Sequence, residues 1–133
     1  MQTDAGRPRV FVVDDEHVIS TTLAIILQRS GFDAVPFADP LAALASIVET
    51  PPDMIVTDVM MPGMTGIDLA LRVTKVCPDC KVLLFSGQAG TNDLLEKARI
   101  HGHQFEIFAK PVPPEAFVKA IRARLSTREE GIQ

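Results

Sequence analysis

The apolar stretch at residues 54–57, Met-Ile-Val-Thr, constrains the fold of this chain more than any other feature. Its apolar and β-branched residues predict a strand that is buried on both faces. Strands of that kind are typical of parallel sheets covered by helices on each side. The stretch ends in Asp58, and Pro62-Gly63 then signals a turn. We therefore expect an α/β protein with Asp58 at the end of a central strand.

Strand and helix patterns alternate along the whole chain. Five strands are predicted by short apolar runs, at residues 10–13, 34–37, 54–57, 81–85 and 105–108. Helices are predicted after each of them, over about residues 19–30, 40–50, 65–76, 91–101 and 114–125. Pro36 and Glu106 place the second and fifth strands at the edges of the sheet. The expected fold is a doubly wound, five-stranded parallel sheet in the order 2-1-3-4-5.

Helical spacing also predicts which side of each helix is buried. In the second helix the apolar positions Leu41, Leu44, Ala45 and Val48 follow the i, i+3, i+4, i+7 pattern. Asp39-Pro40 predicts its start, as an N-cap followed by proline at the first helical position. The last helix should bury Val118, Ile121 and Leu125. The fourth helix is short and weakly apolar, so we expect it to be the most mobile.

Length and composition indicate one domain. The 133 residues, 47% of them hydrophobic and 23% charged, suffice for a buried core, which we expect over residues 8–126, with tails at 1–7 and 127–133. The net charge of -4 argues against nucleic acid as a direct partner. No apolar run is long enough for a membrane span, and residues 1–9 lack the apolar core of a signal peptide. We expect a cytoplasmic protein.

The two cysteines form the sequence Cys77-Pro78-Asp79-Cys80, which is similar to a redox motif of the thioredoxin type. That motif needs a helix N-terminus after a strand, because such a position lowers the pKa of the thiol. Here the cysteines follow a predicted helix and precede a predicted strand. The simpler interpretation is a polar turn with two incidental thiols.

Polar side chains stand at the end of four of the five predicted strands. Asp14 and Asp15 follow the first strand, and Asp58 follows the third. Ser86 follows the fourth and Lys110 the fifth. The carboxyl ends of parallel strands share one edge of the sheet, so these side chains should converge there.

Three neighbouring carboxylates require a cation. At a few ångströms each pair repels by about 4 kcal/mol at an effective dielectric near 20. Oxygen ligands in small number, without cysteine or histidine, suit Mg²⁺, which keeps several waters and leaves room for phosphate oxygens. A carboxylate beside that metal, near a lysine and a hydroxyl, is suited to phosphoryl transfer.

The residues that make up this constellation resemble one family. They are Val12-Val13-Asp14-Asp15-Glu16, the run from Asp58 to Gly66 with Pro62-Gly63 inside it, Ser86-Gly87 and Lys110-Pro111. In this pattern the chain resembles the receiver domain of two-component response regulators, the CheY-like fold, over about residues 8 to 126. The resemblance implies a phosphorylation-driven signalling switch that catalyses only its own phosphorylation and dephosphorylation.

The resemblance also implies a role for each site residue. Asp58 would be the phosphoacceptor, taking the phosphoryl group from a sensor histidine kinase or a phosphotransfer protein. Asp15 would bind Mg²⁺ directly, Asp14 mainly through water, and Met60 through its backbone carbonyl. Two further groups would contact the phosphoryl oxygens, namely Lys110 and Ser86. The surface of the fourth helix, fifth strand and fifth helix would change and act on a downstream protein, and a weak homodimer is a further expectation.

One departure keeps alternatives open. Receivers usually carry Tyr or Phe three residues before the lysine, and this chain has Ile107 there, with Phe105 and Phe108 beside it, for which core packing is the simpler interpretation. The alternatives are a docking module that works without phosphorylation and a receiver cut from a longer regulator. An aspartyl phosphatase is disfavoured because Met60 stands where a second acid is needed. A flavin binder is disfavoured because Asp14-Asp15-Glu16 would repel the flavin phosphate.

Overall fold

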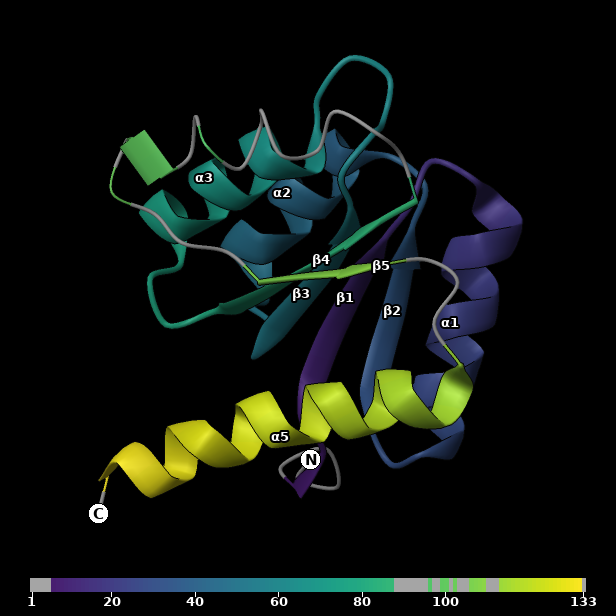
Figure 1. Cartoon of the computed structure of the whole chain (residues 1–133), viewed down its shortest axis with the longest axis vertical. Helices are drawn as coiled ribbons and strands as arrows, with labels where there is room; N and C mark the ends of the chain where they lie inside the picture. The colour runs from purple at the N-terminus through teal and green to yellow at the C-terminus, as the bar shows by residue number, and fades with distance from the viewer. Residues whose placement is uncertain are drawn as a thin grey trace.

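Five parallel strands form one sheet in the order β2-β1-β3-β4-β5 in the computed structural model (Figure 1). They are β1 Arg9–Val13, β2 Asp33–Phe37, β3 Met54–Asp58, β4 Lys81–Ser86 and β5 Glu106–Ala109. The structure describes residues 6–87, 96, 99–100, 102, 106–109 and 113–132. The predicted doubly wound order is confirmed, with Pro36 and Glu106 on the edge strands.

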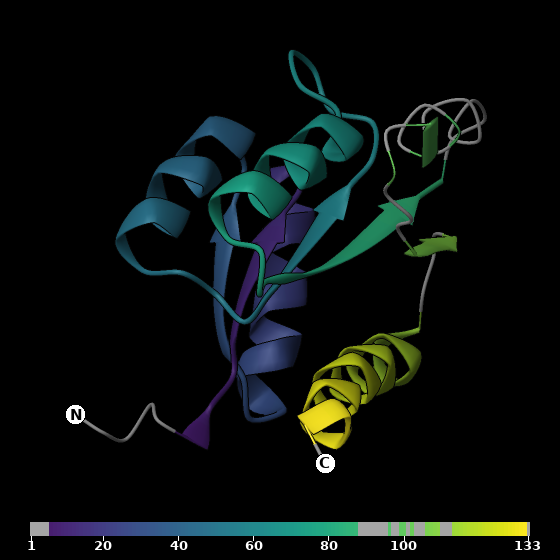
Figure 2. The ribbon, with the colours of Figure 1, turned by 90° about the vertical axis from the view of Figure 1, so that its left-hand side faces the viewer.

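Helices cover both faces of the sheet. They are α1 His17–Arg29, α2 Pro40–Glu49, α3 Gly66–Val76 and α5 Pro114–Ile132. Helices α2 and α3 lie on one side of the sheet, and α1 and α5 lie on the other (Figure 2). The predicted helix over 91–101 falls mostly on residues outside the described part of the chain. The expectation that this helix is mobile concerns the same residues.

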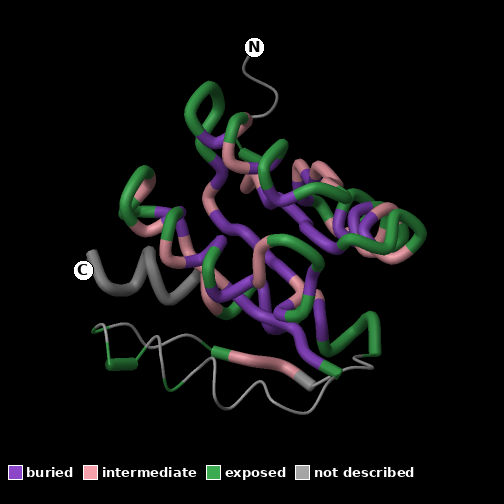
Figure 3. Tube along the Cα trace, turned by 90° about the horizontal axis from the view of Figure 1, so that it is seen from above, coloured by how far each residue is buried: buried purple, intermediate pink, exposed green. Residues whose placement is uncertain are grey.

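Strand β3 is buried on both faces, as its composition predicted. Met54, Ile55, Val56 and Thr57 are each at most 1% exposed. Met54 and Val56 pack into the core beneath α1 and α5, whereas Ile55 packs into the core beneath α2 and α3. The buried segments run through the middle of the molecule, with exposed segments around them (Figure 3). Two apolar layers therefore hold the central strand, and its end, in place.

The buried face of α2 differs from the prediction. Leu41 is 58% exposed and Val48 is 74% exposed. The residues that face the sheet and α3 are Pro40, Ala43 and Ile47, with Leu44 partly buried beside them. The i, i+3, i+4, i+7 pattern holds, but it starts one residue earlier. The helix is apolar at both sets of positions, so spacing alone does not select the face.

The first turn of α2 is capped by Asp39, as predicted. The Leu41 backbone N–H donates to the Asp39 Oδ1 atom at 3.1 Å. We expect Asp39→Ala to lower the free energy of unfolding by about 1 kcal/mol, because the N–H loses its acceptor. Urea unfolding followed by circular dichroism measures the change. Asp39→Asn keeps an acceptor oxygen and serves as the control; an equal loss in both variants would contradict the capping role.

The C-terminal end of α1 agrees with the prediction, and that of α5 does not. Helix α1 ends at Arg29, and Gly31 follows with a φ of 98°, a conformation that favours glycine. The predicted stop is thus confirmed. Helix α5 instead continues to Ile132, beyond the predicted end near residue 125. The added segment is polar, but its Arg and Glu residues are good helix formers and no proline interrupts it.

The buried face of α5 is broader than predicted. Ile121 is fully buried, as expected, whereas Val118 and Leu125 are only partly buried. Phe117 is also fully buried, and its ring lies 5.1 Å from the Phe85 ring of β4. Phe108 packs against the same core, which agrees with its predicted packing role. Phe105 lies outside the described residues.

Candidate functional site

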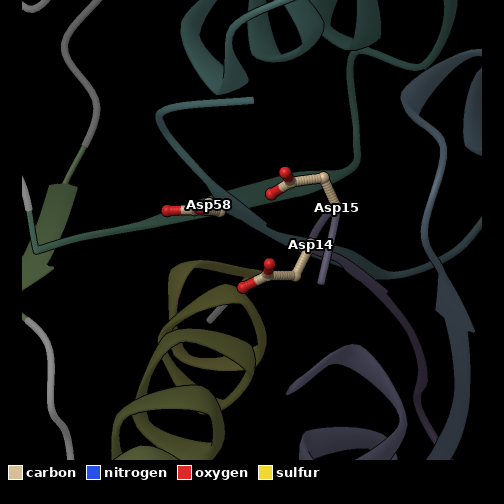
Figure 4. Close-up of side chains that lie close together, drawn as sticks. All are labelled: Asp14, Asp15 and Asp58. Carbon is tan, nitrogen blue, oxygen red and sulfur yellow. The ribbon is translucent and has the colours of Figure 1, made fainter. Parts of the chain in front are cut away.

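Three predicted acids meet at the carboxyl edge of the sheet. Strands β1 and β3 are neighbours, and Val13 pairs with Thr57. An aspartate follows each residue of this pair: Asp14 follows Val13, and Asp58 follows Thr57. Carboxylate oxygens of Asp14, Asp15 and Asp58 all lie within 4.8 Å of one another. They gather on one side of the two strand ends (Figure 4). This position is the switch point of the sheet, where ligands bind in open α/β folds.

Asp14 is the buried acid of the cluster. Its side chain is buried, and the residue is 2% exposed. The Asp14 backbone N–H donates to the Phe37 carbonyl at 3.0 Å, which ties the end of β1 to β2. The Asp14 Oδ1 atom accepts the Glu16 backbone N–H at 2.9 Å, just before α1 begins. The carboxylate therefore also organises the turn into α1.

Asp15 and Asp58 differ from Asp14 in exposure. Asp15 is exposed and Asp58 is half-buried, so the cluster runs from the core to solvent. At 4.8 Å a pair of unit charges repels by about 1 kcal/mol in water and about 3 kcal/mol at a dielectric of 20. A divalent cation bound among the three oxygens would convert this repulsion into attraction. The cluster is therefore able to hold a metal ion.

The backbone around Asp58 is packed tightly against the start of α3. The Val59 N–H donates to the Phe85 carbonyl at 2.9 Å, and the Gly66 N–H donates to the Val59 carbonyl at 2.7 Å. A Cβ atom on Gly66 would lie 2.1 Å from the Asp58 carbonyl oxygen and 2.9 Å from its carbonyl carbon. Only glycine fits there. The role of Gly66 was not predicted from the sequence; the available signal was a glycine, rather than a better helix former, at the first position of a helix.

Ser86 lies next to the acidic cluster in the sheet. Asp58 pairs with Phe85 in the β3–β4 register, and Ser86 follows as the last residue of β4. Ser86 is 7% exposed and pairs with Ala109 of β5. Lys110 follows Ala109 in the sequence and lies outside the described residues. The structure thus brings Ser86 to the edge that carries Asp58, as predicted.

Two further residues of the sequence prediction are placed by the structure. Met60 follows Asp58 by two residues and is 40% exposed. Ile107 is half-buried and packs against the small cluster of Val59, Ile67 and Leu84. An aliphatic side chain therefore fills the position where an aromatic ring was expected from the family pattern.

The fold and the acidic cluster together define a class: an open α/β protein with a metal-competent acidic site at the switch point of its parallel sheet. A family model described as the response regulator receiver domain matches residues 10–122. The chain belongs to this family, the receiver domains of two-component response regulators. None of the helices in the described ranges combines the length and apolar character needed to cross a membrane.

Curated proteins that are similar in sequence to this chain are also response regulators. The DNA-binding response regulator MtrA of Mycolicibacterium smegmatis is 32% identical over 127 residues, which cover 96% of this chain and 54% of that protein. The probable transcriptional regulatory protein TcrX of Mycobacterium tuberculosis is 30% identical, over 99% of this chain and 55% of that protein. The chain thus spans about half the length of these relatives.

Solved structures show the same fold. A response regulator receiver domain protein from Clostridium thermocellum aligns with a TM-score of 0.81 and 25% identity, covering 95% of this chain and 99% of that one. A CheY-like receiver domain protein from Methanospirillum hungatei aligns with a TM-score of 0.85 and 23% identity, with the same coverage, and supports the fold alone.

Proposed function

We propose that this chain accepts a phosphoryl group on Asp58 from a phosphohistidine of a sensor kinase or of a phosphotransfer protein. The observation that carries the proposal is the cluster of three carboxylates within 4.8 Å at the switch point, with Asp58 at the end of the central strand. Family membership supports the assignment.

The transfer requires an in-line attack by one carboxylate. An Asp58 carboxylate oxygen attacks phosphorus, the bond between phosphorus and the imidazole nitrogen breaks, and an acyl phosphate forms on Asp58. Asp58 is half-buried, so part of the residue is accessible from solvent. The buried Asp14, whose Oδ1 atom accepts the Glu16 N–H, is held in place during the transfer.

The donor set of the cluster fits Mg²⁺, because it consists of carboxylate oxygens only. Asp15, the exposed acid, would bind the ion directly, and Asp14 mainly through water. The Met60 backbone carbonyl would be a further ligand. When bound, the ion neutralises negative charge on the carboxylates and on the phosphoryl oxygens. Lys110 would supply a second positive charge to those oxygens.

The product carries more charge than the free carboxylate. A phosphoryl group leaves about -1.5 to -2 where a charge of -1 stood, with new acceptor oxygens. In this proposal the Ser86 hydroxyl, which lies at the end of β4, donates to one of these oxygens after a small movement. That movement would alter the surface of β5 and α5, which we propose as part of the surface that contacts a downstream protein.

A second candidate function is docking without phosphorylation, and Ile107 favours it. Ile107 is already packed against Val59, Ile67 and Leu84, so no aromatic ring is available at this position to follow the Ser86 hydroxyl inward. Binding of a partner with and without beryllofluoride, a phosphoryl mimic, separates the two functions. Equal affinity in both conditions would favour docking, whereas a changed affinity supports the switch.

The expected phosphoryl transfer is measured directly with acetyl phosphate and Mg²⁺ on the purified chain. We expect one phosphoryl group per chain, located on Asp58 by peptide mass spectrometry after borohydride trapping. Excess EDTA should abolish the reaction, because the three carboxylates then lack their counter-ion. Phosphate found at another residue, or transfer that persists in EDTA, would refute the proposed site.

The metal role of Asp15 can be tested separately. We expect Asp15→Asn to weaken Mg²⁺ binding by about tenfold or more, because the exposed ligand loses its charge. Isothermal titration calorimetry with MgCl₂ measures the dissociation constant. Glu16→Gln is the matched control, since it removes the same charge one residue away and lies outside the three-carboxylate cluster. An equal weakening in the control would mean that only the general charge of the loop matters.

We propose that the downstream partner of this chain is a protein and not nucleic acid. The relatives named as DNA-binding are about twice as long as this chain, and the chain itself carries a net charge of -4. Phosphate contacts with DNA need a basic surface. We therefore keep the prediction that this chain alone does not bind nucleic acid.

A further inference from the structure

The turn between α3 and β4 holds two cysteines that the receiver function does not use. Cys77 directly follows α3, and its backbone N–H donates to the Val73 carbonyl at 2.7 Å. Cys80 directly precedes β4, and its N–H donates to the Cys77 carbonyl at 3.0 Å. This bond between the first and fourth residues closes a β-turn, with Pro78 and Asp79 exposed at its tip.

The backbone of this turn suits a disulfide. A β-turn keeps its first and fourth Cα atoms within about 7 Å, and a disulfide needs about 4.4–6.8 Å between the same atoms. The two side chains also lie on the same side of the turn, because both pack against one apolar cluster beneath α2 and α3. The thiols can therefore meet without a large movement of the backbone.

The two thiols differ in access. Cys77 is half-buried at the margin of the cluster, whereas Cys80 is only 7% exposed. The Cys80 thiol donates weakly to the Lys81 carbonyl, with a sulfur to oxygen distance of 3.5 Å. A reagent from solvent would therefore react with Cys77 first. Cys80 would then react only with the modified sulfur of Cys77 beside it.

We propose that Cys77 and Cys80 form a reversible modification site, at which a low-molecular-weight disulfide such as oxidised glutathione converts the two thiols into an intramolecular disulfide. The Cys77 thiolate attacks one sulfur of the oxidant, forms a mixed disulfide and releases one glutathione thiolate. Cys80 gives its proton to water and attacks the Cys77 sulfur, forming the bridge and releasing the second glutathione thiolate. The cysteine pair loses two electrons and the oxidant gains them.

This site is not a catalytic redox motif. Cys77 follows the C-terminal end of α3, whereas catalytic pairs use a helix N-terminus. The proposed bridge therefore modifies this chain and does not transfer a disulfide to other proteins. It joins the end of α3 to the start of β4 and replaces the weak hydrogen bond of the Cys80 thiol.

The test is a redox titration of the full chain in glutathione buffers, followed by acid quenching, alkylation with iodoacetamide and intact mass measurement. We expect both thiols of the monomer to disappear together, with one linked peptide that contains both cysteines. The same titration in concentrated urea is the reference. The folded chain should form the bridge in more reducing buffer than the unfolded chain, because the turn holds the thiols together.

Single variants test the order of reaction. Cys80→Ala should stop at one glutathione on Cys77, because no second thiol is present to resolve it. Cys77→Ala should leave Cys80 unmodified over the same time, because Cys80 is buried. Equal glutathionylation of both variants would overturn the proposal. So would a folded chain that keeps both thiols in buffers that oxidise the unfolded chain, or one that forms only disulfides between chains.

Discussion

Asp58→Asn is expected to reduce labelling by acetyl phosphate in the presence of Mg²⁺ to the background of the assay. The amide is nearly the same size as the carboxylate, but it lacks the negatively charged oxygen that must attack phosphorus. The other two acids do not replace it, because Asp14 already accepts the Glu16 N–H and Asp15 is an exposed residue at the end of a different strand. Autoradiography or intact mass after borohydride trapping measures the label.

Two controls make this prediction specific. Asp68→Asn removes the same charge from an exposed position in the first turn of α3 and should leave labelling unchanged. Thermal unfolding of Asp58→Asn in EDTA should show no loss of stability, because neutralising one of three adjacent carboxylates relieves their repulsion. Undiminished labelling of the Asp58→Asn chain would end the proposal that this residue is the phosphoacceptor.

Gly66→Ala is expected to lower the free energy of unfolding by about 3 kcal/mol, because the added methyl group overlaps the main chain. The new Cβ would lie 2.1 Å from the Asp58 carbonyl oxygen and 3.0 Å from the Val59 Cα. These are backbone atoms of a buried strand end, so no side-chain rotation can make room. Either α3 moves away from β3 or the Asp58 peptide turns, and both displace the site.

Urea unfolding at equilibrium measures the loss, and the Asp58 labelling rate reports on the site. Gly6→Ala is the matched control, since a Cβ there meets no atom within 4 Å. We expect no measurable change for the control and slower labelling for Gly66→Ala. A loss below about 0.5 kcal/mol in Gly66→Ala would show that α3 can shift away from β3 without cost, contrary to the close contact between Gly66 and the Asp58 backbone.

The location of the site could be predicted from local patterns because strand ends are marked in the sequence. The switch from apolar residues to Asp14, and from Thr57 to Asp58, shows where β1 and β3 end. The period of a strand and the rule that parallel strands end at one edge then bring the acids together. The structure confirms this meeting for Asp14, Asp15 and Asp58, within 4.8 Å.

The face of α2 could not be predicted in the same way. Leu41 and Val48 fit the helical period as well as Pro40 and Ile47 do, yet the first two are exposed and the second two are buried. When a helix is apolar on most sides, the helical period does not show which of two adjacent sets of positions is buried. The choice depends on how the helix packs against the sheet and α3, which local periodicity does not contain.

The amino-acid sequence by itself determined the five strands, the order of the sheet and the acids at its edge, because these depend on residue types at short range and on a general rule for parallel sheets. The family followed from the resemblance of the motifs at the strand ends, and the family model confirms it. Only the tertiary structure decided the buried face of α2, the requirement for glycine at Gly66 and the shared packing of Cys77 and Cys80. Each of these depends on distances between segments that are separate in the sequence or that meet through a turn, and such distances exist only once the chain is packed.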